Sequence, residues 1–300
     1  MGINGIANLL KPPGMTSHDV VGVMRRLTGI KKIGHTGTLD PMATGVLPIC
    51  IGKATRIIEY MESDTKLYRC EMILGVETDT QDIWGTVLRH DTEAAAALSE
   101  SRIYETIIAM QGKQEQLPPK YSAIKVNGKR LYEYARKGED VEIKSRQIEI
   151  FDIKPIRFDT RSMRVTFDVH CSKGTYVRTI CTDIGNKLNC GAAMSFLSRM
   201  TTGMFHLKDS VTIEDIEKNG VERYLYDMDY PLAHLPEISI LEAAKEKFSN
   251  GIKLDMNDLS APLTANDGDV CRVYCDDIFL GTAIYDGIND FIAAEKVLCK

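Results

Sequence analysis

The chain of 300 residues contains no apolar run close to the roughly 20 residues that a membrane-spanning helix requires. Its first segment, MGINGIANLLKPPG, has neither a basic region nor a small-residue cleavage site, so we expect no signal peptide. Position 6 is Ile rather than Ser or Thr, which argues against myristoylation of Gly2. These absences predict a cytoplasmic protein that has no membrane partner.

Paired cysteine motifs and histidine clusters are also lacking. None of the eight cysteines belongs to a CxxC pair, and a disulfide framework is typical of short secreted chains. Several cysteines lie in apolar runs such as VLPICIG, which predicts buried, reduced thiols. We expect no bound metal, because no spacing typical of a metal site relates His18, His90, His170, His206 and His234.

Basic residues are outnumbered by acidic ones, but the two are unevenly distributed. The formal net charge of -5 by itself disfavours a nucleic-acid partner. Residues 209–300 hold 8 Lys and Arg against 19 Asp and Glu, whereas residues 1–208 hold 29 against 23. The basic excess is concentrated in 1–58 and 118–138. This asymmetry favours a polyanionic partner for the larger part of the chain.

The spacing of apolar residues predicts the main helices and strands. A first helix, expected at 17–28, has Thr16 or Ser17 as its cap and Gly29 as its stop. Further helices are expected at 53–63, 93–111, 131–138 and 175–188. Strands are expected at 46–52, 66–75, 145–158 and 161–172.

The order of these elements predicts the fold class. Strands followed by helices, without regular βαβ alternation, indicate an α+β fold built on a mainly antiparallel sheet that helices flank. After about residue 208 the composition shifts, and short strands between Gly and Asp turns follow. We therefore expect two domains, 1–235 and 236–300, of which the second is small and β-rich. No additional apolar surface helix stands out, so we expect a monomer.

One loop segment, GHTGTLDPMATGVL, carries a candidate catalytic carboxylate at Asp40. An Asp-Pro pair is often no more than a turn or a helix start. Here Gly34, Gly37 and Gly45 flank the pair, and such glycines let the backbone approach a ligand closely. The segment is basic on both sides, and we expect no companion carboxylate nearby. Asp40 is thus suited to act as nucleophile or base on a nucleic-acid sugar or base.

Two further segments carry candidate RNA contacts. In QLPPKYSAIKVNGKRLYEYARKG, basic residues alternate with tyrosines, which suits phosphate binding and base stacking. A solvated basic face with ordinary core tyrosines explains the same pattern equally well. In SKGTYVRTI, Arg178 is expected in the first turn of an apolar helix. It is either a surface residue or the partner of a buried carboxylate.

Taken in order, these segments resemble the TruB family of tRNA pseudouridine synthases. The most specific motifs are GTLDP and PPxYSAxK, here GTLDP and PPKYSAIK. The resemblance spans most of residues 5–206, and residues 236–300 are more loosely similar to the PUA-like, RNA-binding C-terminal module of bacterial members. The matching stretches are KPPGMTSHDVV, GHTGTLDPMATGVLPICIGKATR, KLYRC, GVETDTQDIWG, QLPPKYSAIKVNGKRLYEYARKG, SKGTYVRTICTDIG and FLSRMTTGMF.

The resemblance implies a pseudouridine synthase fold and the isomerisation of uridine 55 in the T-loop of tRNA. It makes Asp40 the catalytic carboxylate, with Arg178 as its partner and Tyr68 packed on the target base. The reaction breaks a glycosidic bond, turns the uracil and joins C5 to the sugar without a redox change, so no cofactor is expected. Attack of Asp40 on the base and action at the sugar both remain open.

Further residues are implied to bind the substrate. Tyr176 and Leu197 would line the uridine pocket, His35 would wedge into the T-loop, and Lys11 with Pro12 would support the active-site loop. The matched basic segment adds the last three residues of this group, which are Lys120, Tyr121 and Lys125.

The chain departs from the family pattern at two places. Leu197-Ser198-Arg199 stands where the family usually has LRR, and Ala193 stands where many members have His. Both departures concern peripheral RNA contacts rather than the chemistry.

Two other functions are compatible with these motifs. One alternative is the catalytic subunit of a guide-RNA-directed pseudouridylation complex, although the length and acidic tail favour an enzyme without an obligate protein partner. A second is a non-catalytic RNA-folding factor, and tRNA folding could also be an additional role of the enzyme.

The need for a counterion leads to a geometric expectation. A carboxylate in a pocket that stacks uracil is partly desolvated, which raises its pKa. A nearby cation must oppose this effect, and a guanidinium can bind a carboxylate through two donors. We therefore expect Arg178 within about 4 Å of Asp40. Lys53 or Arg56 would replace it if the two residues lie far apart.

Overall fold

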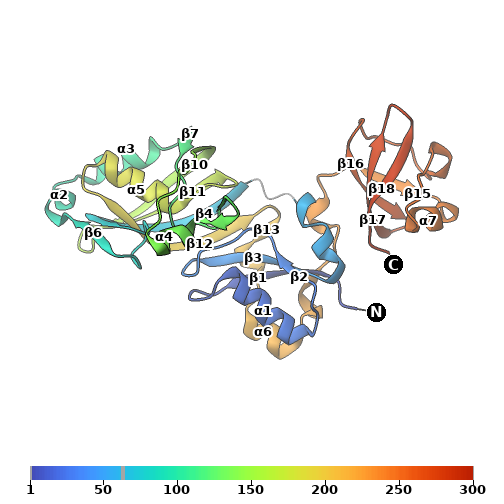
Figure 1. The fold of residues 1–300 in the computed structure, drawn as a ribbon, viewed down its shortest axis with the longest axis horizontal. Helices are drawn as coiled ribbons and strands as arrows, with labels where there is room; N and C mark the ends of the chain where they lie inside the picture. The colour runs from blue at the N-terminus through green and yellow to red at the C-terminus, as the bar shows by residue number, and fades with distance from the viewer. Residues whose placement is uncertain (1, 62–64, 300) are drawn as a thin grey trace.

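The computed structural model describes residues 2–61 and 65–299, and two β-sheets organise them (Figure 1). The larger sheet is mixed, with β2 (Ile33–His35) added to β3 and β13 (Phe205–His206) added to β12. The remaining strands lie in the order β14 (Leu225–Tyr226), β1 (Gly5–Lys11), β3 (Thr44–Ile51), β12 (Ala192–Thr202), β4 (Thr65–Leu74), β11 (Arg164–Ser172), β10 (Arg146–Asp159) and β7 (Gly112–Gln116).

The two halves of this sheet meet where β12 pairs with β3. That pairing is parallel, at Ser198–Thr44 and Arg199–Gly45, whereas the other pairings described in the sheet are antiparallel. The predicted α+β class with a mainly antiparallel sheet is therefore confirmed. Because β3 begins at this junction, the loop that precedes β3 lies over β12.

Helices α1 (Ser17–Thr28) and α6 (Ile213–Asn219) cover one face of the first half of the sheet (Figure 1). The predicted ends of α1 are confirmed, because Thr16 and Asp19 form a capping box and Gly29 ends the helix with φ of 70°. The buried residues of α1 pack with Ile216 of α6 and with apolar residues of β1 and β3.

Helices α2 (Thr92–Ala96), α3 (Glu100–Ile108) and α5 (Val177–Lys187) accompany the second half. Their apolar side chains pack with β4, β10, β11 and β12 in one hydrophobic cluster. The predicted alternation of β4 is confirmed, since Tyr68, Cys70, Met72 and Leu74 are buried in this cluster. Strands β5 (Val76–Thr78) and β6 (Val87–His90) form a small separate pair.

The basic segment folds as a hairpin and a short helix. Strands β8 (Lys125–Val126) and β9 (Lys129–Arg130) turn at Asn127 and Gly128, where φ is 51° and 83°. Helix α4 (Leu131–Lys137) follows directly and ends at Gly138, as predicted.

The helix predicted at 53–63 was wrong. Two short 3₁₀ turns replace it, η1 (Gly52–Arg56) and η2 (Ile58–Tyr60), and residues 62 and 63 lie outside the described part. The cause is tertiary, because Lys53 Nζ donates to the Leu298 carbonyl at 2.9 Å and Arg56 Nη1 donates to the Val297 carbonyl at 2.6 Å. Contacts with the end of the chain thus fix a conformation that local spacing does not encode.

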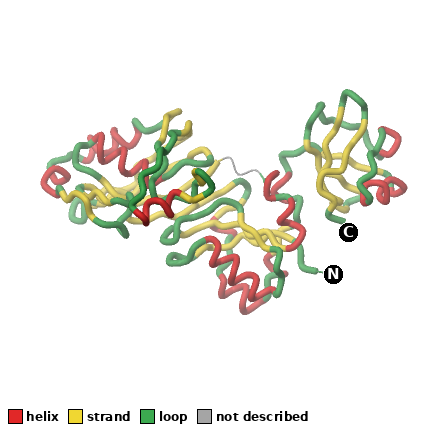
Figure 2. The backbone as a smooth tube through the Cα atoms, in the orientation of Figure 1, coloured by secondary structure: helices red, strands yellow, loops and turns green. Residues whose placement is uncertain are grey.

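The second sheet lies in the last quarter of the chain. Figure 2 shows it apart from the larger sheet, with helix α7 (Glu242–Ser249) beside it. Its strand order is β15 (Glu237–Ile240), β16 (Val270–Cys275), β17 (Ile278–Asp286) and β18 (Phe291–Val297). It has its own hydrophobic cluster around Phe248, while Leu298 is buried against Ile57 of the larger part.

The remaining elements are short 3₁₀ turns, η3 (Leu207–Asp209), η4 (Glu222–Tyr224), η5 (Tyr230–Leu232) and η6 (Met256–Asp258). No helix in the described part of the chain is long and apolar enough to cross a membrane.

Gly45 is the glycine on which the sheet junction depends. Its φ is +110°, and a Cβ at this position would collide with the backbone of Arg199 on β12. We predict that Gly45→Ala lowers the free energy of unfolding by about 2–4 kcal/mol. Gly22→Ala is the control, because Gly22 is in α1 with open space around it, and should raise stability by about 0.5–1 kcal/mol. Urea unfolding of both variants measures the difference, and equal effects would contradict a strained junction.

Candidate active site

The loop that carries Asp40 joins β2 to β3 and is fixed on both sides. Asp40 opens a tight turn in which the Ala43 N–H donates to the Asp40 carbonyl at 3.1 Å, with Pro41 in the position that favours such turns. The Leu39 N–H donates to Ser17 Oγ at 2.9 Å. The backbone around the carboxylate is therefore tied to helix α1.

Lys11 fixes the same loop through hydrogen bonds to its backbone. Its side chain is fully buried, and its Nζ donates to the carbonyls of Pro12, Pro41 and Ala43 at 2.8, 2.9 and 2.7 Å. Burial lowers the pKa of Lys11 to about 8, and the charge of Asp40 opposes that effect. The structure thus places Lys11 where the resemblance put it, as a support of the loop.

Arg178 is the ion-pair partner of Asp40, as expected. Its Nε lies 2.8 Å from Asp40 Oδ2, and its Nη2 donates to Oδ1 at 3.1 Å. The Arg178 side chain is 4% exposed, whereas that of Asp40 is 34% exposed. One side of the carboxylate is therefore held by a buried cation, and the other side is open to a ligand.

Two backbone carbonyls fix the position of this guanidinium. Arg178 Nη1 donates to the Thr80 carbonyl and Nη2 to the Tyr121 carbonyl, each at 3.0 Å. Arg178 also lies in the first turn of α5, where the helix dipole disfavours a cation. The surrounding acceptors compensate for this position.

A second carboxylate, Asp82, lies beside the pair, so the expectation of no companion carboxylate was wrong. Asp82 Oδ2 is 3.8 Å from Arg178 Nη1, and Asp82 Oδ1 accepts from the Thr80 hydroxyl at 2.7 Å and from the Trp84 N–H at 3.1 Å. The backbone turn that positions Asp82 depends on the preceding residue, Gln81, whose φ is 65°. The sequence offered one signal for Asp82, which is the matched stretch GVETDTQDIWG. It did not reveal that Asp82 approaches Arg178, almost a hundred positions away.

These contacts act on the pKa of Asp40 in opposite directions. Burial raises the pKa most, the Arg178 guanidinium lowers it, and Asp82 raises it again. The net pKa lies above the ordinary value for aspartate. The ion pair with Arg178 is therefore the main interaction that opposes neutralisation of the carboxylate.

Tyr68 and Leu197 belong to the apolar cluster that also holds the residues preceding Asp40 and Arg178. Tyr68 is 8% exposed and Leu197 is 5% exposed, and both pack in the cluster that contains Leu39 and Val177. Burial raises the pKa of Tyr68 to about 12, and Asp40 is close enough to contribute to this shift. The phenol is therefore protonated at neutral pH.

Tyr176 precedes α5 and is fixed by a reciprocal pair of hydrogen bonds. The Tyr176 N–H donates to Gln116 Oε1 at 2.8 Å, and Gln116 Nε2 donates back to the Tyr176 carbonyl at 3.1 Å. The guanidinium of Arg146 lies 5.5 Å from the Tyr176 ring centre. Gln116 is a positioning residue that the sequence did not reveal.

His35 ends β2 and begins the Asp40 loop. Its Nδ1 is buried and has no hydrogen-bond partner among the described residues. Burial lowers the pKa of His35, with further contributions from the charges of Arg199 and His18. The imidazole is therefore neutral at pH 7.

The structure separates the three residues of the basic segment. Tyr121 reaches the site through its carbonyl, which accepts from Arg178. Lys120 is exposed and pairs with Asp140 at 3.0 Å, and Lys125 is exposed in the β8–β9 hairpin. The tyrosines of α4 lie near cations of the segment itself, with Arg136 5.3 Å from the Tyr132 ring centre.

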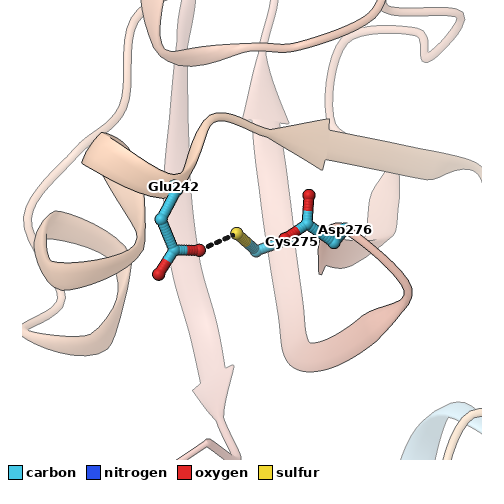
Figure 3. A group of neighbouring side chains, drawn as sticks. All are labelled: Glu242, Cys275 and Asp276. Atoms are coloured by element: carbon cyan, nitrogen blue, oxygen red, sulfur yellow. Dashed lines mark hydrogen bonds between the residues drawn. The ribbon is translucent and has the colours of Figure 1, made fainter.

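Three side chains with metal-ligating atoms lie close together in the C-terminal part of the described chain. Ligand atoms of Glu242, Cys275 and Asp276 lie within 4.8 Å of one another (Figure 3). The Cys275 thiol donates to Glu242 Oε2 at 2.8 Å, and burial together with Glu242 raises the pKa of this thiol to about 11. This geometry is a thiol–carboxylate hydrogen bond, since a metal would require the thiolate.

Sequence comparisons find the same family over most of the chain. The profile described as TruB family pseudouridylate synthase (N terminal domain) matches residues 25–177, and that of the tRNA pseudouridylate synthase B C-terminal domain matches residues 178–234. The chain is 45% identical to tRNA pseudouridine synthase B of Alkaliphilus oremlandii, over 94% of this chain and 93% of the relative. It is 44% identical to the protein of the same name from Clostridioides difficile, over 98% of each.

Solved structures have the same fold. A structure of a Cbf5-Nop10-Gar1 complex is similar with a TM-score of 0.71 and 25% identity, over 94% of this chain and 78% of that one. A structure of an H/ACA RNP bound to a substrate RNA containing 2'-deoxyuridine is similar with a TM-score of 0.74 and 23% identity, over 99% and 85%. These likenesses support the fold expected from the sequence.

The lowered pKa of Lys11 predicts a measurable pH dependence of stability. Between pH 8 and its ordinary pKa of 10.5, the unfolded chain keeps the Lys11 proton and the folded chain releases it. The free energy of unfolding should therefore rise with pH in this window, by at most about 1.4 kcal/mol per pH unit from this group. Urea unfolding at pH 7 to 10 should show that Lys11→Met lacks this rise. Lys154→Met, at an exposed lysine, should keep it, and identical profiles for all three proteins would contradict the assignment.

Proposed function

Because the chain belongs to the TruB family of pseudouridylate synthases, we propose that it isomerises uridine 55 in the T-loop of tRNA to pseudouridine. The observation that carries this proposal is the Asp40 carboxylate, held by Arg178 on one side and open on the other. Leu39, the residue before Asp40, packs in one apolar cluster with Tyr68 and Leu197. A carboxylate next to an apolar wall suits a reaction on a flipped-out base.

The target uridine must leave the base stack to reach this carboxylate. Unstacking costs a few kcal/mol, which stacking and hydrogen bonds in the pocket offset. We assign the stacking surface to Tyr68 and the walls to Tyr176 and Leu197. His35, neutral and at the rim of the loop, is placed to enter the T-loop where bases have been displaced.

Asp40 carries the chemistry in its ionised form. Its partner Arg178 lowers the pKa that burial raises, and we assign to this ion pair the task of keeping the carboxylate ionised. The carboxylate then acts either on the base or at the sugar. Once C5 has joined the sugar, Asp40 is again a free carboxylate. The reaction conserves atoms and oxidation state, so it needs no cofactor.

The RNA backbone is held by the basic parts of the chain. Exposed cations of the hairpin and of α4, among them Lys125 and Arg130, suit phosphate contacts because their side chains are accessible to solvent. Lys120 would have to exchange Asp140 for a phosphate. We assign residues 236–300 to a second, PUA-like domain, whose acidic surface limits it to local contacts with the RNA.

We further propose that the enzyme acts as a monomer in the cytoplasm, without guide RNA or an obligate protein subunit. The relatives at 42–45% identity match this chain over most of their length and are named tRNA pseudouridine synthase B. The neighbours of known structure described as complexes are less similar, at 25% identity or below. This difference supports the enzyme over the catalytic subunit of a guide-RNA complex.

Purified protein should form pseudouridine in the T-loop of an unmodified tRNA transcript without guide RNA. Asp40→Asn should abolish turnover, because the amide cannot replace the carboxylate, and should leave the Kd for tRNA within about threefold. Pseudouridine mapping and a binding titration measure the two effects. Asp19→Asn, at an exposed helix cap, is the control and should stay active. A tenth of the wild-type rate in Asp40→Asn would remove Asp40 from the chemistry.

Arg178 variants test the fork of donors on Asp40. Arg178→Lys should lower the single-turnover rate at saturating enzyme at least about tenfold, because an ammonium cannot bind both carboxylate oxygens in the same geometry. Arg178→Met should lower it further. Arg164→Lys changes an arginine that pairs with Glu71 at 2.6 Å and serves as the matched control. Equal rates for the Arg178 and Arg164 variants would exclude a role of the ion pair in the reaction.

A further inference from the structure

A second buried arginine, Arg199, lies behind the candidate site and takes no part in the Asp40–Arg178 pair. Its side chain on β12 is 0% exposed. Its Nε donates to the Val46 carbonyl at 2.7 Å, and its Nη2 donates to the Gly37 carbonyl at 3.1 Å. Arg199 therefore joins β12 to β3 and to the loop that carries Asp40.

The charge of Arg199 has no carboxylate partner in the part of the chain that the structure describes. Its Nη1 is buried and forms no hydrogen bond with a described residue. Burial lowers the pKa of Arg199, and the group that opposes this effect is Tyr68 rather than an acid. A buried guanidinium with a free donor and no counterion is costly, so it calls for a functional explanation.

Tyr68 is the residue opposite Arg199 in the sheet. The two are direct partners in the antiparallel pairing of β12 with β4, and side chains at such positions lie on the same face. Both are buried, and Arg199 lowers the pKa of Tyr68 against the effect of burial. The pairing therefore places the two buried side chains next to each other on one face of the sheet.

The hydrogen-bonding capacity of the two groups sets the direction of the phenol proton. A guanidinium only donates, so in a hydrogen bond between these two groups the phenol oxygen would be the acceptor. The phenol O–H is then left to donate in another direction. In the proposed complex, the uracil of the substrate offers carbonyl oxygens that could accept this proton.

We propose that Arg199 is a positioning residue, whose guanidinium fixes the Tyr68 hydroxyl so that its proton points at the target uridine. The inference rests on the proposed function, because it requires Tyr68 to contact the base. A direct contact of Arg199 with an RNA phosphate is disfavoured, since the free Nη1 has no access to solvent. A purely structural role in the loop is the other outcome that the test must separate.

A double-variant cycle tests the inference on single-turnover rates at saturating enzyme. Arg199→Gln and Tyr68→Phe should each lower the rate at least about tenfold, with the Kd for tRNA changed less than about threefold. The double variant should be no slower than Tyr68→Phe, because Arg199 has nothing to position once the hydroxyl is absent. Arg199→Lys, which keeps the charge, should recover part of the rate.

Controls separate positioning from folding. Arg69→Gln removes an arginine next to Tyr68 on β4 that pairs with Asp168 at 2.9 Å, and it should leave the rate unchanged. Thermal unfolding of each variant establishes that it is folded. If Arg199→Gln does not fold, the same cycle with Arg199→Lys carries the test, with a smaller expected effect.

Two results would overturn the inference, and they differ in what else they affect. Additive losses in the double variant would mean that Arg199 acts through the loop alone, and the assignment of Tyr68 would stand. A wild-type rate for Tyr68→Phe would remove both the base contact of Tyr68 and the role of Arg199, while the function of Asp40 would be unaffected.

Discussion

The ion pair between Asp40 and Arg178 is the interaction on which the rest of the site depends. A carboxylate placed against an apolar wall tends to take up a proton, and burial raises its pKa in this structure. Arg178 opposes that tendency from a buried position that carbonyls of Thr80 and Tyr121 also fix. The proposed chemistry therefore requires two chain segments more than a hundred residues apart to meet with precision, and the structure holds Arg178 Nε 2.8 Å from Asp40 Oδ2.

The sheet junction provides this precision. Gly45 allows β3 to start directly against Arg199 of β12, and β12 pairs in turn with β4, which carries Tyr68. Lys11 and Arg199 donate to carbonyls of that loop from opposite sides. Arg178 pairs with Asp40 and lies 3.8 Å from Asp82, and the charge of Lys11 also acts on Asp40.

Much of this arrangement could be predicted from the sequence, for physical reasons that differ between elements. Helix 17–28 was predictable because its cap Thr16 and its stop Gly29 are local signals. The Asp40–Arg178 contact was predictable because the family resemblance pointed to Arg178 and a desolvated carboxylate needs a nearby cation. The position of Asp82 beside Arg178 was not predictable, since it depends on the left-handed backbone conformation of Gln81. The 3₁₀ turns at 52–60 were missed because distant carbonyls near Leu298 fix them.

The protonation state of Asp40 tests the central claim most directly. ¹³C NMR of protein labelled at the aspartate carboxyl carbons, with the signal assigned by its loss in Asp40→Asn, would follow this group through a pH titration. The account predicts an ionised carboxylate at pH 7 in the wild-type protein and a titration displaced to higher pH in Arg178→Met. The same titration curve in both proteins would contradict the claim that Arg178 keeps Asp40 ionised.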